Sequence, residues 1–218
     1  MVATSLNVLN IENDITISEI YDNLINYDGN NDNYFILNWI NNDELSGKYV
    51  YVQNIEQQIY NIKNRSFESQ IIPKAVTIPF EITNNKIFVW SNKSNLNRFI
   101  FALTNIIKGI LLSAIKISIS KILSKINKQN TKVTKICLND IVLAEDLIGK
   151  FYTDLYSYGD SYGILKKYKE QIEKITFQYY INDISLTLTL SENGNITLYK
   201  NYDNFDDEQL DFLKKLFI

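Results

Sequence analysis

The sequence predicts an α+β protein in which antiparallel sheets carry helices packed on one face. Short runs with strand-like alternation recur along the chain, and the clearest, Ile184–Leu190, precedes an Asn193-Gly194 hairpin turn. Apolar residues with helical spacing recur in separate segments between these runs. The chain has 218 residues and is 45% hydrophobic, which favours a folded protein with a sizeable core. Grouped strands followed by grouped helices are typical of the α+β class.

The N-terminal half begins with an expected strand at residues 5–11. A helix should follow from Ile17, because Thr16 and Glu19 form a capping box, and Gly29 can end it. Further segments have strand character, and a final segment has helical character that begins at Ser94 and ends at Gly109. The four expected strands are 34–40, 48–52, 58–62 and 75–82, the last forming a hairpin with 86–90 around Asn84-Asn85. Pro79 cannot donate a backbone hydrogen bond, so its strand is expected at a sheet edge.

The C-terminal half is expected to open with a second helix, Ile110 to about Asn127. A short strand at 133–138 should precede a helix that Asn139 or Asp140 caps and that continues to Leu155. The glycine-containing stretch 158–163 indicates a turn, followed by a helix near 164–173. Strands around the Asn193-Gly194 turn and a last helix capped by Asp206 or Asp207 complete the chain.

Two stretches share a hairpin-then-helix plan, one near residues 81–107 and one near 188–217. This echo predicts two ββα-containing halves, residues 1–109 and 110–218. The alternatives are a chance repetition of a common motif and one compact domain, since no linker rich in proline, glycine or serine separates the halves.

Composition argues against several classes of protein. The single cysteine, Cys137, cannot form an internal disulfide, and the N-terminus lacks the basic and apolar regions of a signal peptide. Lys108 and Lys116 interrupt the most apolar zone, 99–119, so no membrane span is expected. A cytoplasmic location follows as an expectation.

Catalysis is not expected either. The chain has no histidine, which removes the commonest general base and metal ligand. Residues 159–163 match GxSxG, but Ser161 would have no imidazole to take its proton, so a turn is the better interpretation. No motif for a metal or cofactor is present, and we expect no enzyme and no cofactor.

The strongest functional lead is the separation of charge along the chain. Residues 82–139 hold ten of the 22 basic residues and none of the 25 acidic ones. Such asymmetry indicates an anionic partner. If residues 110–127 are one helix that continues further, several lysines share an arc opposite its apolar face. The candidate phosphate-binding residues are Lys116, Lys121, Lys125, Lys128, Lys132 and Lys135.

Several functions remain open for these lysines. A non-enzymatic accessory protein could bind DNA or RNA through them with little sequence specificity, because only Arg65 and Arg98 are available for reading guanine. Alternatively, the chain is a structural or protein-interaction subunit, virus-encoded or homo-oligomeric, whose basic face docks on an acidic partner. A membrane surface or a merely solvated lysine face are the remaining alternatives.

Overall fold

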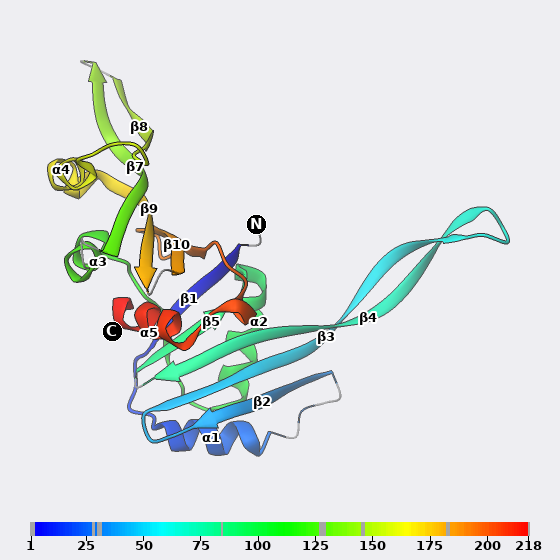
Figure 1. Cartoon of the computed structure of the whole chain (residues 1–218). Coiled ribbons are helices and arrows are strands. Elements are labelled where there is room, and N and C mark those ends of the chain that lie inside the picture. Colours follow the sequence, from blue (N-terminus) through cyan, green and yellow to red (C-terminus); the bar gives the residue numbers. More distant parts are fainter. Residues whose placement is uncertain are drawn as a thin grey trace. The chain divides into compact units, whose positions relative to one another are not determined.

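The computed structural model describes residues 3–27, 29, 32–83, 85–126, 130–144, 147–181 and 184–217. Eleven strands and five α-helices occur in these ranges, so the chain is broadly α+β, as the sequence predicted (Figure 1). The strand pairs detailed below are antiparallel. The chain divides into two compact units. The C-terminal unit is Met1–Asn10, Trp90–Asn92 and Ser113–Ile218, and the N-terminal unit is Ile11–Val89 and Lys93–Leu112.

Each of the two units is assembled from segments that alternate along the chain. The division into halves 1–109 and 110–218 remains a prediction. The N-terminal unit has the strand order β2-β3-β4-β5. Its elements are α1 (Ile17–Ile25), β2 (Asn33–Ile40), β3 (Glu44–Asn61), β4 (Ser66–Thr83), β5 (Lys86–Trp90) and α2 (Lys93–Ile106). The expected strands 48–52 and 58–62 are therefore parts of one long strand, β3.

Local signals fix both helices of this unit. The Thr16 hydroxyl accepts from the Glu19 backbone, and the Glu19 carboxylate accepts from the Thr16 N–H at 2.8 Å, which confirms the capping box. Beyond α2, Gly109 has a φ of 87°, a left-handed conformation that favours glycine. The Asn13 amide holds this bend, because it donates to the Gly109 carbonyl and accepts from the Leu111 N–H.

An aromatic cluster forms the core of the N-terminal unit. Phe99 of α2 lies 5.2 Å from Phe80 of β4, and Phe80 lies 5.8 Å from Phe35 of β2, measured between ring centroids. Tyr49 of β3 completes the cluster at 4.9 Å from Phe35. Gly47 is required beside it, because a Cβ there would lie 3.0 Å from the Phe80 ring and 2.6 Å from the Ile36 carbonyl oxygen.

The expectation that Pro79 marks an edge strand is wrong for β4 as a whole. β4 lies between β3 and β5, and Pro79 is opposite Lys48 of β3. The hairpin with β5 is confirmed, but its register covers only Phe80–Thr83, so Pro79 lies just beyond the last β5 partner. The missing N–H is therefore tolerated at a local edge. Asn84 of the expected turn lies outside the described residues.

The C-terminal unit has the strand order β1-β11-β10-β9-β7-β8, and the short β6 also pairs with β1. Its strands are β1 (Thr4–Ile11), β6 (Leu112–Ala114), β7 (Thr131–Ala144), β8 (Leu147–Asp154), β9 (Ile172–Ile181), β10 (Ile184–Ser191) and β11 (Ile196–Leu198). Its α-helices are α3 (Ile119–Lys125), α4 (Ser161–Lys167) and α5 (Asp207–Phe217).

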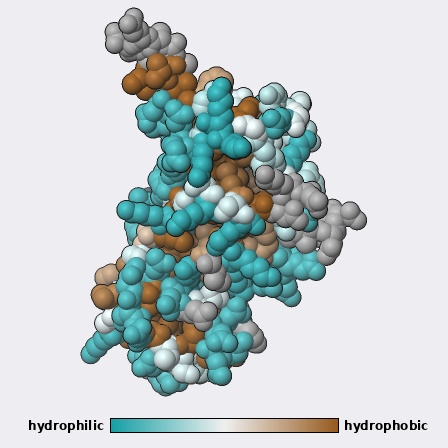
Figure 2. Space-filling model, turned by 90° about the vertical axis from the view of Figure 1, so that its left-hand side faces the viewer, coloured by the Kyte–Doolittle hydropathy of each residue, from teal (hydrophilic) through white to brown (hydrophobic). Residues whose placement is uncertain are grey.

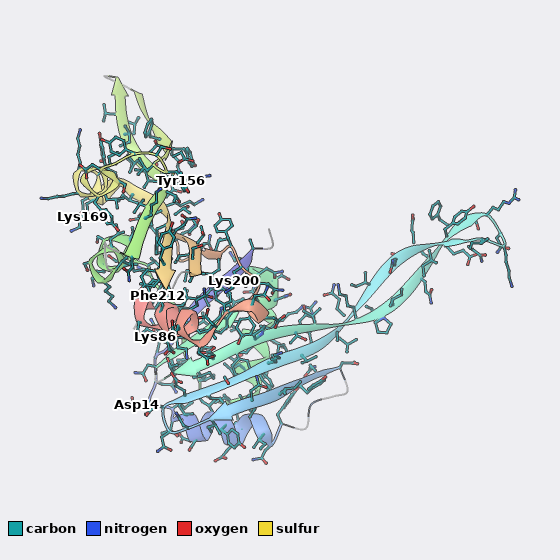
Figure 3. All side chains as sticks on the ribbon, viewed as in Figure 1. Asp14, Lys86, Tyr156, Lys169, Lys200 and Phe212 are labelled. Carbon is teal, nitrogen blue, oxygen red and sulfur yellow. The ribbon has the colours of Figure 1, made fainter. Side chains whose placement is uncertain are left out.

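Alternation in β9 and β10 separates a buried from a polar face, as the sequence predicted. Phe177, Leu186, Leu188 and Leu190 are buried. Gly194 adopts a φ of 89° in the predicted turn between β10 and β11. The Asp206 carboxylate accepts from the Gln209 N–H at 2.8 Å, which confirms the expected cap of the last helix. Phe212 of α5, labelled in Figure 3, belongs to this core-facing helix. Its ring stacks on that of Tyr179, with centroids 3.7 Å apart.

Two expected helices are wrong. Residues 110–118 do not form a helix: β6 pairs with β1, the Ile115 N–H donates to the Val8 carbonyl, and Ser118 caps the shorter α3. The expected helix from Asn139 to Leu155 is instead a β7–β8 hairpin. Apolar residues at 147, 148, 151, 152 and 155 resemble a helical stripe, but pairing of β7 with both β8 and β9 satisfies the backbone groups instead.

No helix in the described ranges has both the length and the apolar character needed to cross a membrane.

Removing the α1 capping hydroxyl should destabilise the chain measurably. We expect Thr16→Ala to lower the free energy of unfolding by about 1 kcal/mol, because the Glu19 N–H loses its acceptor. Urea denaturation monitored by circular dichroism measures the change. Ser18→Ala, an exposed first-turn position of the same helix, is the matched control and should change stability little. Equal losses in both variants would contradict the capping argument.

Candidate nucleic-acid interface

The predicted lysines do not lie on one helix. Lys116 is exposed in the segment before α3, and Lys121 and Lys125 are exposed on α3 itself. Lys132 and Lys135 lie on β7. Lys128 lies outside the described residues. Lys121 and Lys125, four residues apart, are neighbours on α3, whereas the pair on β7 belongs to a sheet.

A β-bulge places Lys132 and Lys135 on the same face of that sheet. Two residues three apart in a regular strand point to opposite faces. Here Lys132 is opposite Gln178 and Lys135 is opposite Thr176, so Thr134 is an extra residue between them. Because Gln178 and Thr176 are two apart on β9, their side chains share a face, and the two lysines share it with them.

Hydroxyl side chains form a row across this face. The registers align Ser5 of β1, Thr197 of β11, Thr189 of β10, Thr176 of β9 and Lys135 of β7. The Thr176 and Thr189 hydroxyl oxygens are 2.7 Å apart, which confirms that they share the face. At about 4.8 Å per strand, the row extends roughly 19 Å. Gln178 and Thr187 lie beside it.

Lys174 is a third lysine on this surface, because it alternates with Thr176 and Gln178 along β9, and it is exposed. We call the surface the lysine face; its members are Lys132, Lys135, Lys174, Thr176, Gln178, Thr187, Thr189 and Thr197. The opposite face of the same strands is the buried core, which includes Val133, Ile175 and Phe177.

The lysines of this face are not neutralised by described carboxylates. None of Lys132, Lys135 and Lys174 has a carboxylate of a described residue within ion-pair distance. Asp154 is opposite Lys135 in register, but its carboxylate accepts from the Tyr156 N–H. The Lys132 ammonium instead lies 3.8 Å from the centre of the Tyr156 ring.

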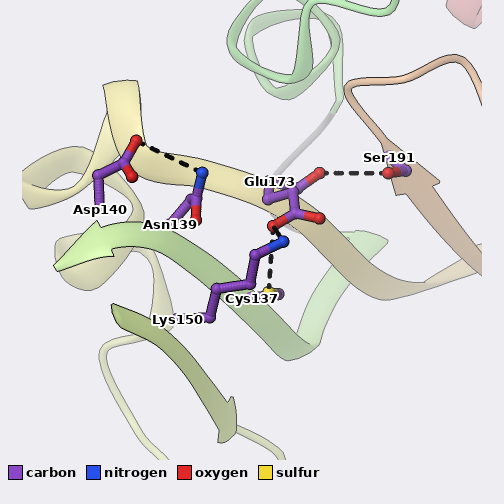
Figure 4. A network of polar contacts seen from close by, with 6 residues as sticks. All are labelled: Cys137, Asn139, Asp140, Lys150, Glu173 and Ser191. Atoms are coloured by element: carbon purple, nitrogen blue, oxygen red, sulfur yellow. Dashed lines mark hydrogen bonds and ion pairs between the residues drawn. The ribbon is translucent and has the colours of Figure 1, made fainter. Parts of the chain in front are cut away.

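The acid nearest to Lys174 in sequence, Glu173, is already paired. Its carboxylate accepts from the Lys150 ammonium at 2.5 Å and from the buried Cys137 thiol at 3.9 Å (Figure 4). The Lys150 hydrogen bond holds the pKa of Glu173 below its ordinary value, so the carboxyl group stays ionised and matched by its partner. The pKa of Lys150 is raised in turn by the same bond.

Exposed tyrosines surround the lysine face. Tyr180 donates to the Gln178 side chain, and the Tyr199 hydroxyl is 3.4 Å from that of Thr189. Tyr152 is opposite Cys137, on the side of β8 that carries Asp154. These three rings and Tyr156 are between 40% and 67% exposed, so nucleobases could stack on them.

The sequence contained a signal for part of this site. Phe177 and Tyr179 alternate as the apolar face of a strand does, and the residues that alternate with them, Thr176, Gln178 and Tyr180, form the other face. Lys174 belongs to the same series. The bulge at Thr134 carries no such signal, because it depends on the β9 partner.

Other sequence candidates lie elsewhere. The strand aromatics Tyr49, Tyr51, Phe88 and Trp90 are buried, so they belong to the core and not to a stacking surface. Asp206 caps α5, and Asp211 pairs with Lys214 rather than with a candidate lysine. Ser161 of the GxSxG match is buried at the start of α4. Gly163 is needed there, because a Cβ would overlap the Asp160 carboxylate that caps this helix.

Comparison with known proteins gives no family. The sequence matches no protein-family model, and no curated protein is significantly similar to it. Within the described residues, no group of three or more cysteine or acidic side chains gathers as a metal site would require.

The ion pair at Glu173 should be visible in its titration. Replacing Lys150 by methionine removes the hydrogen bond that lowers the pKa of Glu173, so that pKa should rise. Carboxyl-detected NMR across pH 2–7 measures it in wild type and variant. In the wild type, the stability contributed by Glu173 is present above its unfolded pKa of about 4.5 and is lost as pH falls through the lower folded pKa.

Lys169→Met is a suitable control, because this lysine pairs with Glu170 and not with Glu173. An unchanged Glu173 pKa in Lys150→Met would contradict the assignment of the bond as the main cause of the shift.

Proposed function

We propose that the chain is a non-enzymatic nucleic-acid-binding protein whose lysine face contacts phosphates. The observation that carries the proposal is the gathering of Lys132, Lys135 and Lys174 on one half-exposed sheet face, where none of them forms an ion pair with a described carboxylate. Lysine ammonium groups and threonine hydroxyls both donate hydrogen bonds to phosphate oxygens. The row of four hydroxyls and Lys135, about 19 Å long, could accompany a backbone of several nucleotides.

Single-stranded DNA or RNA fits this surface better than a duplex groove. The exposed tyrosines offer ring faces on which unpaired bases stack without regard to their identity. Arginine, which reads guanine by two hydrogen bonds, is absent from the C-terminal unit: the chain's two arginines, Arg65 and Arg98, both belong to the N-terminal unit. Little sequence specificity and strong salt dependence follow.

In the proposed arrangement, α3 and α5 cover one face of the sheet of the C-terminal unit. α5 stacks Phe212 on Tyr179, which alternates with Gln178 and so points away from the lysine face. α3 contacts both α5 and β9. With these two helices on the core face, the lysine face stays open to a ligand. Lys121 and Lys125 then belong to the helix side and are not part of the primary contact.

An acidic protein is the second candidate partner, and the β7–β8 hairpin favours it. From the last residue paired with β9, Leu138, to its tip, this hairpin exposes Val142, Ile148 and Phe151, with 70%, 64% and 48% of their surfaces accessible. Figure 2 shows hydrophobic side chains at the end of this hairpin above a mostly hydrophilic surface. Exposed apolar side chains that lie close together are typical of a protein-interaction surface.

Charge removal on the lysine face tests the proposal. We expect the wild type to bind fluorescent single-stranded DNA and RNA, with log K falling by about 2 per tenfold increase in salt for three phosphate contacts. The triple variant Lys132→Gln, Lys135→Gln, Lys174→Gln should lose most of this affinity and its salt dependence. Fluorescence anisotropy titrations at several salt concentrations measure both.

The matched control is Lys116→Gln, Lys121→Gln, Lys125→Gln, which removes the same charge from the helix side. It should bind nearly as the wild type does. Equal loss in both triple variants would point to a diffuse charge effect, and no binding by the wild type at low salt would refute the proposal. Capture of an acidic polypeptide such as polyglutamate, but not of nucleic acid, would favour the second candidate.

Stacking gives an independent test. Tyr180→Leu and Tyr199→Leu remove two rings but no charge, so single-strand affinity should fall roughly tenfold while the salt slope remains unchanged. Duplex binding should change much less. A change in the salt slope alone would contradict a stacking role.

A further inference from the structure

The far halves of β3 and β4 form a two-stranded arm without flanking strands. The register with β2 ends at Tyr51 of β3, and that with β5 begins at Phe80 of β4. Between them, Gln53–Asn61 and Ser66–Lys74 pair only with each other among the described residues. The arm extends beyond β2 and β5 (Figure 1).

Large apolar side chains are exposed along the arm. Tyr60, Ile62, Phe67 and Ile71 expose 50%, 83%, 69% and 67% of their surfaces. The Tyr60 and Phe67 rings contact each other across the strands, at 5.2 Å between centroids. An isolated two-stranded ribbon is marginally stable in water, so the arm would gain from a further strand or surface that covers it.

The outer edge of β4 can accept such a strand. The Val52 N–H of β3 donates to the Asp32 carbonyl, so it points away from β4. Its register partner, Ala75, therefore points its own backbone groups away from β3, as do the odd-numbered residues from 67 to 79. Pro73 and Pro79 belong to this set, which agrees with their lack of an N–H. Backbone N–H donors without a strand partner among the described residues therefore remain on this edge, at Phe67, Ser69, Ile71 and Ala75.

We propose that two copies of the chain pair antiparallel along these edges of β4, with the two-fold axis at Ile71. Glu68 and Lys74 are the charged residues between Ser66 and Pro79. They lie three positions on either side of Ile71. In this register, each Glu68 is opposite Lys74 of the second copy, and two cross-strand ion pairs form.

Side-chain volume fits the same register. Phe67 is opposite Ala75 of the second copy, so a large exposed ring meets a small residue. The Ile71 side chains meet at the axis and cover each other. The Glu68 carboxylate accepts through Oε1 from the amides of Asn61 and Asn64, at 2.8 and 3.1 Å, and its Oε2 has no partner among the described residues. The Lys74 ammonium has none among these residues either. Pro73 has no backbone N–H, so one hydrogen bond is missing in each copy, but the Ser69 N–H opposite it donates to the Pro73 carbonyl.

Charge exchange tests this register. Lys74→Glu places two like charges opposite each other twice per dimer, so the dissociation constant should rise about tenfold or more. Glu68→Lys should weaken association similarly, and the double variant Glu68→Lys, Lys74→Glu should restore it. Sedimentation velocity, up to about 100 μM of the full chain, measures the dimer. Lys63→Glu, at the tip outside the register, is the matched control.

A wild type that stays monomeric over this range would overturn the proposal. So would a dimer that all these variants leave unchanged, because its interface would lie elsewhere. Circular dichroism shows whether each variant is folded, and recovery in the double variant separates lost pairing from lost folding.

Disulfide trapping provides a second readout. In a Cys137→Ser background, Ile71→Cys should form a disulfide-linked dimer under mild oxidation, because opposed residues lie about 5 Å apart. Ser69→Cys is the control, since the two copies of residue 69 would be about 13 Å apart along the strands and beyond disulfide reach. Equal trapping at both positions would contradict the register.

Discussion

The antiparallel pairing of β7 with β9 decides which side chains the C-terminal unit presents to solvent. Each buried backbone N–H and C=O needs a partner, and β9 supplies the partners for Thr131–Leu138. In a regular strand, Lys132 and Lys135 would point to opposite faces, because they are three residues apart. The extra residue Thr134 brings both side chains to the same face, and its hydroxyl donates to the Thr176 carbonyl. Without this bulge, one of the two lysines would point into the core beside Phe177.

The strands with simple alternation could be predicted from the sequence. In β9, β10 and β11, a continuous apolar face is separated from a polar one. The turn between β10 and β11 contains Gly194, whose positive φ favours glycine. α1 was equally predictable, because the capping box acts within four residues. These elements are determined by neighbours in the chain, so the pattern of residues is enough to recognise them.

The segments that were predicted wrongly depend on partners far away in sequence. Ile110–Ile117 has helical spacing, yet it places Ile115 against Val8, more than one hundred residues away. Asn139–Leu155 has a helical stripe too, but β-branched and aromatic residues at 141, 142, 148 and 151 also suit a hairpin. Periodicity alone does not separate the two, and the tertiary partner decides. Several of the candidate lysines were grouped on an expected helix, so that grouping failed with it, although Lys132 and Lys135 share a sheet face.

The lysine face and the arm belong to different units, and their chemistry favours two distinct contacts. The lysine face has unpaired ammonium groups among hydroxyls, and such a surface gains little from burying apolar area. The arm exposes aromatic rings and isoleucines, and its outer strand, β4, has Glu68 and Lys74 at symmetric positions around Ile71. A two-fold pairing through the arm would place two lysine faces in one assembly, and two weak phosphate contacts on one strand then act with a high effective concentration. Modest affinity at each face would therefore be compatible with tight binding by the pair, which connects the assembly of the chain to its proposed nucleic-acid binding.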